Sequence, residues 1–470
     1  MWITIDKHSG LSLSRQIYGA IRSRILRGEP AAGDKLPSTR ELSSQLGVSR
    51  NTVLEAYELL LAEGFLASRS GSGTYVAQGA VMKDAPLDPF SGHRHRQSSP
   101  VPVTASPDAG RREGRAVISF RTGLPEIGHF PRRTWGDLLR TAALDLPDLA
   151  FGYGDPAGEP QLRDALSRYL LQSRGVCVPA GGLAITSGAV QGIQLAARLL
   201  LQPGDEALIE EPTNAELKSI LASTGAVLLG VPVDDYGLVT EALPRPGRSS
   251  LIYVTPSHQF PLGGILPIQR RIELIRYARE TGSFIIEDDY DSEFRFDGAP
   301  VHSLQSLAPE RVFYIGTFSK IMFPALRVGY AVIPPAFFER FVALKKLADY
   351  HTPVLEQIAL ARFIEERKLH THIFRMRKIY RDRRNALLES LETHFPDRHR
   401  ILGKAAGLHL TVELRTPLPD ALPQLLGQEG VFASQIPGQR LVLGYGHLEK
   451  DEIAEGIRRI HSAIAKGEPQ

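Results

Sequence analysis

The sequence contains a single cysteine, Cys177, among its 470 residues. A disulfide within the chain is therefore excluded, which favours a reducing compartment. The chain opens with no cationic and apolar leader, and no apolar run approaches the ~20 residues that span a bilayer. These absences predict a soluble, cytoplasmic protein with no membrane partner.

An excess of charge of one sign is also lacking. The 55 basic and 52 acidic side chains leave a formal net charge of only +3. Such a balance does not indicate nucleic-acid binding, so that function has to be argued from a local motif. Hydrophobic residues make up 43% of the chain, which at this length is enough for the cores of two or three domains.

The N-terminal region has the pattern of a small helical domain. Leu13, Ile17, Ile21 and Ile25 recur every four residues, which predicts an amphipathic helix over 11–27. The glycine that follows is a typical helix end.

Two shorter helices and a hairpin are predicted next. Ser38 is placed to cap the first helix, with a glutamate three residues later, and Gly47 ends it. Ser49 is placed to cap the second helix, which runs to about Glu63. Two short helices around a glycine turn are typical of a helix-turn-helix, whose second helix enters the major groove of DNA. Residues 65–77 then read as two strands around a Gly-Ser-Gly tip, which is a wing.

The segment LPSTRELSSQLGVSRNTVLEAYELLLAEGFL, residues 36–66, resembles the GntR-type winged helix over its full length. Hydroxyl and amide side chains with one cation at the start of the second helix suit phosphates and base edges. A helical domain with a hairpin that binds no DNA is the alternative. The resemblance implies that the following residues contact DNA or shape the wing: Arg40, Ser49, Arg50, Thr52, Gly71 and Gly73.

The composition changes sharply after the wing. Residues 79–115 are rich in Pro, Ser, Gly and charge, and such a segment cannot bury enough surface to order itself. We therefore expect a DNA-binding domain at 1–78, a flexible linker at 79–115 and a large α/β domain at 116–470. Strands and helices alternate in the large domain, which predicts a doubly wound sheet.

Two apolar runs in the large domain, 284–287 and 312–316, have the pattern of parallel strands buried on both faces. Functional side chains in such sheets lie just beyond the strand ends. Five polar residues follow these two strands: Asp288, Tyr290, Thr317, Ser319 and Lys320.

These residue types suit a cofactor with an aldehyde and a pyridine ring. Lys320 can form a Schiff base, Asp288 can keep the ring nitrogen protonated, and Tyr290 can hydrogen-bond the ring hydroxyl. The pattern therefore predicts a pyridoxal 5'-phosphate (PLP) site. A lysine that is exposed at the surface, or one held in a salt bridge, is the alternative for Lys320.

A phosphate group would need its own anchors. Arg327 offers an arginine fork. Gly188, Ala189 and Val190 open a predicted helix, whose free backbone N–H groups and dipole attract an anion.

The acidic residues around Asp288 allow a rival interpretation as a divalent-metal site. That interpretation gives Lys320 and Tyr290 no role, so no metal is predicted. The rival cluster consists of Asp288, Asp289, Asp291 and Glu293.

The motifs EDDYDSEF, GTFSK and PALRVGY resemble fold-type I PLP enzymes of the aspartate aminotransferase-like group. Together with the N-terminal motif, nearly the whole chain is similar to the MocR subfamily of GntR-type transcriptional regulators. The resemblance implies a mostly parallel sheet, a smaller C-terminal α/β part and a homodimer in which Tyr153 reaches the partner's cofactor phosphate. Whether the two chains exchange DNA-binding domains is left open.

Three positions concern the handling of a ligand. Asn214 stands where these enzymes commonly have a ring-stacking tyrosine, and Val442 stands where they have an arginine for the substrate carboxylate. Arg440, two residues earlier, is a candidate effector-binding residue or an edge residue facing solvent. His258 either approaches the cofactor ring or is an interior histidine.

The sequence thus predicts a PLP-dependent transcription regulator that binds double-stranded operator DNA. It would sense an amine, an amino acid or PLP itself through the Schiff base on Lys320. An active PLP-dependent aminotransferase with an accessory DNA-binding domain is the alternative. A regulator that has lost its cofactor is disfavoured by the intact lysine.

Overall fold

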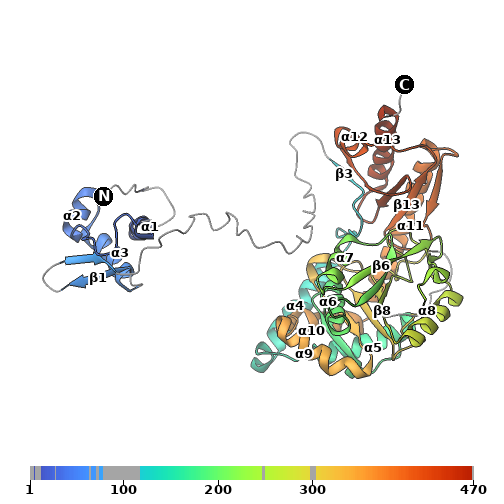
Figure 1. The fold of residues 1–470 in the computed structure, drawn as a ribbon, viewed down its shortest axis with the longest axis horizontal. Coiled ribbons are helices and arrows are strands. Elements are labelled where there is room, and N and C mark those ends of the chain that lie inside the picture. The colour runs from blue at the N-terminus through green and yellow to red at the C-terminus, as the bar shows by residue number, and fades with distance from the viewer. Residues whose placement is uncertain are drawn as a thin grey trace. The chain divides into compact units, whose positions relative to one another are not determined.

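The computed structural model describes residues 5, 12–26, 28–62, 65–69, 73–77, 117–245, 249–296 and 303–467. The chain divides into two compact units, Met1–Ser99 and Pro100–Gln470 (Figure 1). Gly71 and the predicted linker at 79–115 lie outside the described residues. Within the described ranges, no helix is long and apolar enough to cross a membrane.

The first unit is a helix-turn-helix followed by a two-stranded antiparallel sheet. Its core confirms the predicted amphipathic helix, because Ile17, Ile21 and Ile25 are fully buried against Val53 and Leu60. The elements are α1 Leu13–Leu26, α2 Thr39–Leu46, α3 Arg50–Ala62, β1 Leu66–Arg69 and β2 Gly73–Val76.

The predicted helix caps are present. The Ser38 hydroxyl accepts the N–H of Glu41 at 3.2 Å, and Ser49 accepts the N–H of Thr52 at 3.1 Å. Gly47 ends α2 in the left-handed conformation with φ 61°, which glycine adopts without steric cost. Local sequence therefore fixes where both helices begin and where the first one ends.

The second unit is built on an eight-stranded sheet with the order β4-β11-β10-β9-β8-β5-β6-β7. Neighbouring strands from β10 to β6 are parallel, whereas β11 and β7 run antiparallel to their neighbours. The strands are β4 Leu183–Thr186, β5 Glu206–Glu211, β6 Val227–Asp234, β7 Gly237–Leu238, β8 Ser249–Val254, β9 Phe284–Asp289, β10 Val312–Thr317 and β11 Gly329–Val332.

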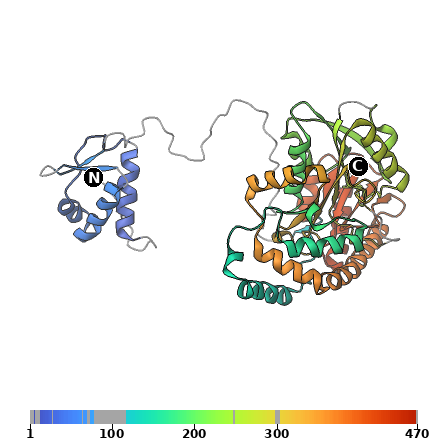
Figure 2. The same ribbon diagram turned by 90° about the horizontal axis from the view of Figure 1, so that it is seen from below.

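Both faces of this sheet are buried, as the apolar runs predicted. On β8, Leu251 and Tyr253 pack in one apolar cluster with α6 and α9, whereas Ile252 and Val254 pack in another with α8. Figure 2 shows helices on both sides of the strands. The helices around the sheet are α4 Arg132–Asp145, α5 Pro160–Arg174, α6 Ala189–Leu200, α7 Ala215–Ala222, α8 Ile268–Thr281, α9 Phe338–Asp349 and α10 Val354–Glu365.

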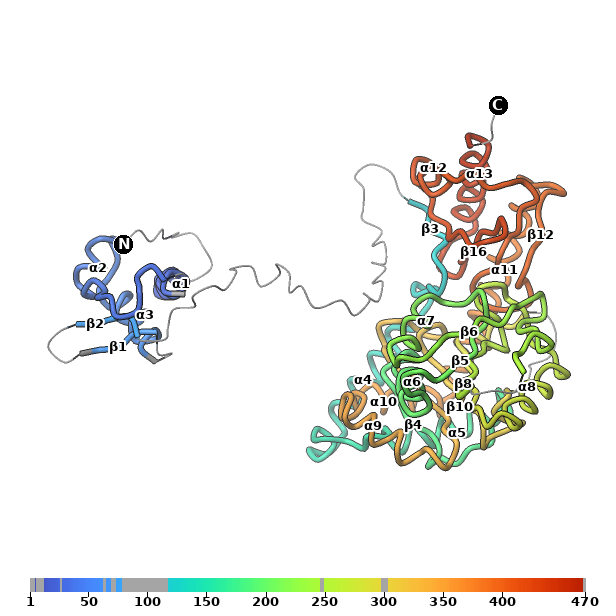
Figure 3. Tube along the Cα trace, in the orientation of Figure 1, coloured from blue at the N-terminus to red at the C-terminus, as the bar shows by residue number. Residues whose placement is uncertain are grey.

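A smaller antiparallel sheet forms the C-terminal part, with the order β12-β13-β16-β15. The tube trace shows that β3, from the beginning of this unit, lies beside α12 and α13 near its end (Figure 3); β3 pairs with β14 in parallel. The elements are β3 Ile118–Ser119, α11 Lys368–His394, β12 His399–Leu402, β13 His409–Leu414, α12 Leu422–Glu429, β14 Val431–Phe432, β15 Ser434–Ile436, β16 Arg440–Gly444 and α13 Lys450–Gly467.

Candidate functional site

The predicted site residues gather where β4, β9 and β10 end. Thr186 at the end of β4 and Thr317 at the end of β10 both pair with Gly329 of β11, so these two strand ends lie at one edge of the sheet. A Cβ on Gly329 would lie 2.7 Å from the carbonyl carbon of Gly188. Glycine at this position therefore lets the turn after β4 approach the strand closely.

Lys320 lies just beyond β10. Its Nζ donates to the backbone oxygen of Gly123 at 2.7 Å. Burial lowers the pKa of the Lys320 amine, and the negative charges of Asp291 and Asp288 oppose this shift. A lowered pKa increases the neutral fraction of a lysine, which is the form that attacks a carbonyl group.

Asp288 is the residue before the end of β9, and its two carboxylate oxygens differ in their contacts. Tyr253 donates to its Oδ2 at 2.6 Å, whereas Oδ1 is buried and has no hydrogen-bond partner within the described part of the chain. Burial raises the pKa of the Asp288 carboxyl to about 6. A protonated pyridine nitrogen would supply the missing donor and stabilise the charged carboxylate. This orphaned oxygen fits the predicted role of Asp288.

Tyr290 is joined to a buried histidine–aspartate cluster made of His258, Asp291 and His409. The Tyr290 hydroxyl donates to the backbone oxygen of His258 at 2.8 Å, and the Nδ1 of His258 lies 3.0 Å from Asp291. The ring centroids of His258 and His409 are 4.7 Å apart. The His258 ring is therefore held by a carboxylate, and its Nε2 remains without a partner among the described residues.

The turn that opens α6 has the features of an anion site. Gly188 has φ 85° and Ala189 begins the helix, followed by the exposed Val190. Arg327 Nη2 donates to the oxygen of Ser187 at 2.9 Å, and a Cβ on Gly188 would lie 2.8 Å from that nitrogen. The Arg327 guanidinium therefore lies beside the N-terminus of α6.

A pair of hydroxyl groups and a carboxylate also lie at this edge of the sheet. The hydroxyl of Thr317 donates to that of Ser319 at 3.1 Å, beside Lys320. Asp349, at the end of α9, accepts from the Ser187 hydroxyl at 3.0 Å, and Lys345 donates to the same carboxylate at 2.6 Å. No local pattern marks Asp349 as part of this site, because it lies 162 residues after Ser187 in the chain.

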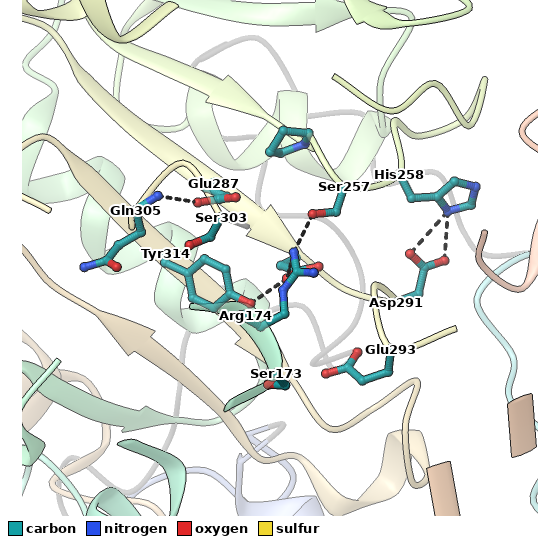
Figure 4. Close-up of polar contacts among 12 residues, drawn as sticks. Ser173, Arg174, Ser257, His258, Glu287, Asp291, Glu293, Ser303, Gln305 and Tyr314 are labelled. Atoms are coloured by element: carbon teal, nitrogen blue, oxygen red, sulfur yellow. Dashed lines mark hydrogen bonds and ion pairs between the residues drawn. The ribbon is translucent and has the colours of Figure 1, made fainter. Parts of the chain in front are cut away.

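A buried ion pair at the end of β9 was also not predicted from the sequence. Arg174, in the last turn of α5, contacts Asp289 at 2.7 Å and donates to Ser257 at 2.6 Å. Tyr314 donates to the same carboxylate at 2.5 Å. Figure 4 shows Arg174 between Ser257 and Tyr314. An arginine at a helix end is usually solvated, so nothing in the sequence marked Arg174 as buried.

The four carboxylates of the rival metal interpretation point to four different partners. Asp288 binds Tyr253, Asp289 binds Arg174, Asp291 binds His258, and Glu293 accepts from Tyr169 at 3.0 Å. They form no common group of ligands. Of these four, only Asp291 belongs to a set with metal-like spacing among the described residues, together with His258 and His409.

The structure also shows the contacts of the three positions that were expected to bind a ligand: Asn214, Val442 and Arg440. Asn214 caps α7, because its Oδ1 accepts the N–H of Glu216 at 2.8 Å. Val442 is buried on β16 opposite Thr411. Arg440 lies 3.3 Å from Glu413 in the same sheet.

The predicted DNA-contacting residues lie at the surface of the first unit. Arg40, Ser49 and Arg50 are exposed, and Thr52 is half-buried. Ser49 and Thr52 hydroxyls are 2.7 Å apart at the start of α3. Gly73 begins β2 with φ 117°, a conformation that favours glycine.

Comparisons with known proteins agree with both units. Residues 13–76 match the bacterial regulatory proteins of the gntR family, and residues 139–460 match aminotransferase class I and II. The chain is 36% identical to a probable rhizopine catabolism regulatory protein, MocR, of Rhizobium meliloti, over 98% of this chain and 96% of that protein. The chain belongs to the MocR-type GntR regulators.

Other MocR-type regulators are similar over the full length. The pyridoxine biosynthesis regulator PdxR of Corynebacterium glutamicum is 30% identical over 99% of both chains.

A solved kynurenine aminotransferase of Pyrococcus horikoshii matches with a TM-score of 0.70 and 28% identity, covering 76% of this chain and 93% of that one. The predicted winged helix and aminotransferase-like fold are therefore confirmed.

Proposed function

We propose that this MocR-type regulator binds operator DNA through its winged helix and senses a small amine through PLP held at Lys320. The observation that carries the proposal is the buried, unpartnered oxygen of Asp288 at the same sheet edge as Lys320. When bound, PLP supplies an aldehyde that reacts with amines and a ring that withdraws electrons.

Different side chains of the protein would bind different parts of the cofactor. Asp288 would hold the ring nitrogen, Tyr290 the ring hydroxyl, and Arg327 with the Ser187–Gly188 turn the phosphate. Lys320 would be the attachment point, and burial lowers the pKa of its amine. Lys320 would hold the cofactor, and an amine bound beside it would change the contacts of this lysine and so shift the population of conformations that bind DNA.

A homodimer is part of the proposal. Tyr153 is 85% exposed and stacks on the exposed Tyr350, with ring centroids 5.2 Å apart. Leu149 and Phe151 are also exposed nearby in the chain. Contiguous exposed aromatic and apolar residues favour burial against a second copy, and Tyr153 would then reach the partner's phosphate site.

An active aminotransferase is the second candidate. The similarity to a 2-aminoadipate transaminase of Thermus thermophilus, 29% identical over 74% of this chain, favours it, as does the complete set of Lys320, Asp288 and Tyr290. Asn214 acts as a helix cap and Val442 carries no charge, and these two positions favour sensing over turnover.

The test is a titration of purified, PLP-loaded protein with amines and amino acids. Visible absorbance, DNA binding and keto-acid formation are followed together. We expect a ligand that changes absorbance and DNA binding without accumulation of keto acid, and Lys320→Ala should be colourless. Many turnovers with unchanged DNA binding would instead identify an aminotransferase.

A further inference from the structure

A lysine in the second half of α9 is completely buried. The Lys345 side chain is 0% exposed, and its Nζ donates to Oδ1 of Asp349 at 2.6 Å, one helical turn later. Asp349 is the one acceptor for this amine among the described residues. A fully buried lysine is rare and needs a partner for its charge. A buried cation therefore fixes the Asp349 carboxylate at the end of α9.

The other oxygen of Asp349 faces the turn that opens α6. This Oδ2 accepts from the Ser187 hydroxyl at 3.0 Å and from Nε2 of Gln191 at 2.8 Å. The Oε1 of Gln191 in turn accepts the backbone N–H of Ser187 at 2.8 Å. One carboxylate thus holds the hydroxyl of Ser187 directly and its backbone through Gln191.

The Asp349 carboxylate is ionised at neutral pH. Burial raises the pKa of this carboxyl, but hydrogen bonds from Lys345 and Gln191 outweigh burial, so the pKa is lowered. A phosphate bound at the turn would lie within about 10 Å of this charge, because the Ser187 hydroxyl that Asp349 holds is only a few bonds from Gly188. Without a cation beside it, the carboxylate would repel the phosphate.

The residue after Asp349 has a strained backbone. Tyr350 follows α9 with φ 62° and ψ −66°, a combination that a residue with a Cβ rarely adopts. Such strain persists where the surrounding structure fixes it, and it is concentrated at ligand sites. The backbone thus gives a second, independent indication that the end of α9 serves a ligand site.

We propose that Lys345 and Asp349 are positioning residues for the phosphate group of the cofactor. Asp349 holds the Ser187–Gly188 turn in the form that leaves the N–H groups at the start of α6 free for the phosphate. Lys345 balances the charge of Asp349, so that this carboxylate does not repel the phosphate. Both residues act through the turn, without contact to the cofactor. This inference rests on the proposed function, because it concerns the same phosphate site.

The test compares two ligands on the full-length, cofactor-free protein. They are PLP and pyridoxal, which has the same ring and aldehyde carbon but no phosphate. Visible absorbance gives the dissociation constant of each ligand, and the ratio of the two constants isolates the contribution of the phosphate. A residue that only stabilises the fold affects both ligands alike, whereas a residue that positions the phosphate turn changes the ratio.

Two substitutions of Asp349 form the first part of the test. Asp349→Ala removes the acceptor for Ser187 and Gln191 and should lower the preference for PLP about tenfold, the size expected for one lost hydrogen bond to a charged group. Asp349→Asn keeps an acceptor oxygen and should retain most of the preference. An alanine variant with the wild-type preference would overturn the assignment, and so would equal losses in the two variants.

Substitutions of Lys345 test the balance of charge. Lys345→Met leaves the Asp349 charge uncompensated and should lower the preference for PLP about tenfold, at a distance of about 10 Å and a dielectric constant of about 20. Combining it with Asp349→Asn removes that charge and should restore the preference. Lys346→Met, at an exposed position of the same helix, is the control and should change nothing. Equal effects of the two single methionine variants would contradict the proposal.

The outcomes separate this inference from the proposed function. A wild-type protein that binds neither ligand would overturn both. A wild-type protein that prefers PLP, with Lys345 and Asp349 variants that keep the same ratio, would overturn only the positioning role. If circular dichroism shows that Lys345→Met does not fold, the comparison of Asp349→Ala with Asp349→Asn decides.

Discussion

Replacing Arg174 with methionine should destabilise the second unit by about 3–5 kcal/mol, the usual cost of breaking a buried ion pair. The side chains of Arg174 and Asp289 are 5% and 2% exposed, and their charged atoms are 2.7 Å apart. Without the guanidinium, Asp289 would retain the Tyr314 hydroxyl at 2.5 Å. A hydroxyl donates one hydrogen bond but does not neutralise a buried charge.

The assay is urea unfolding of the full chain, followed by circular dichroism and tryptophan fluorescence. The matched control is Arg168→Met, in the same helix. Arg168 lies 3.0 Å from Glu365, but these side chains are 60% and 36% exposed, so the loss should stay below about 1 kcal/mol.

Equal losses for the two methionine variants would refute the reasoning. A further variant separates charge from packing. Arg174→Met combined with Asp289→Asn should recover most of the loss, because no unpaired charge remains. Failure to recover would mean that Arg174 stabilises the fold through its packing.

Three other perturbations have defined outcomes. Asp288→Asn should stabilise the cofactor-free protein at neutral pH by up to ~3 kcal/mol and weaken PLP binding. The carboxyl pKa of about 6 lies above the ordinary 3.8, so Asp288 favours the folded state below pH about 4 and this contribution is lost as the pH rises through about 6. Urea unfolding at pH 4 and pH 7 measures it, and an unchanged pH dependence would contradict it. Ser49→Ala removes the cap of α3 and should cost about 1 kcal/mol in the first unit, with weaker DNA binding by fluorescence anisotropy; unchanged binding would remove Ser49 from the interface. Gly329→Ala would bring a Cβ to 2.7 Å from the Gly188 backbone, so a fluorescence titration should show weaker PLP binding, and an unchanged affinity would mean that the turn does not hold the phosphate.

Much of the fold was predictable because its signals are local. The four-residue spacing between Ile17, Ile21 and Ile25 predicted a helix with one buried face, and all three side chains are fully buried. The apolar runs of β9 and β10 predicted adjacent parallel strands, and the two strands pair in parallel. Their ends therefore brought Asp288 and Lys320 to one edge.

The partners of these side chains were not predictable in the same way. Asp288 and Asp289 are neighbours in sequence and looked like one acidic cluster. Successive side chains of a strand point to opposite faces, so Asp288 meets Tyr253 and Asp289 meets Arg174. The residues that pack against each face of the sheet come from distant segments of the chain, so local sequence does not identify them.

The sequence by itself determined the two kinds of domain, the elements around the Lys320 site and the residue types that a PLP-like cofactor requires, because these follow from local spacing and from motifs. Only the tertiary structure decided that Arg174 is buried, that His258 is bound to Asp291 and that Arg440 lies beside Glu413. Each of these contacts joins residues far apart in the chain, and the register of strands and the packing of helices set them. The charges around the lysine are therefore a property of the folded chain.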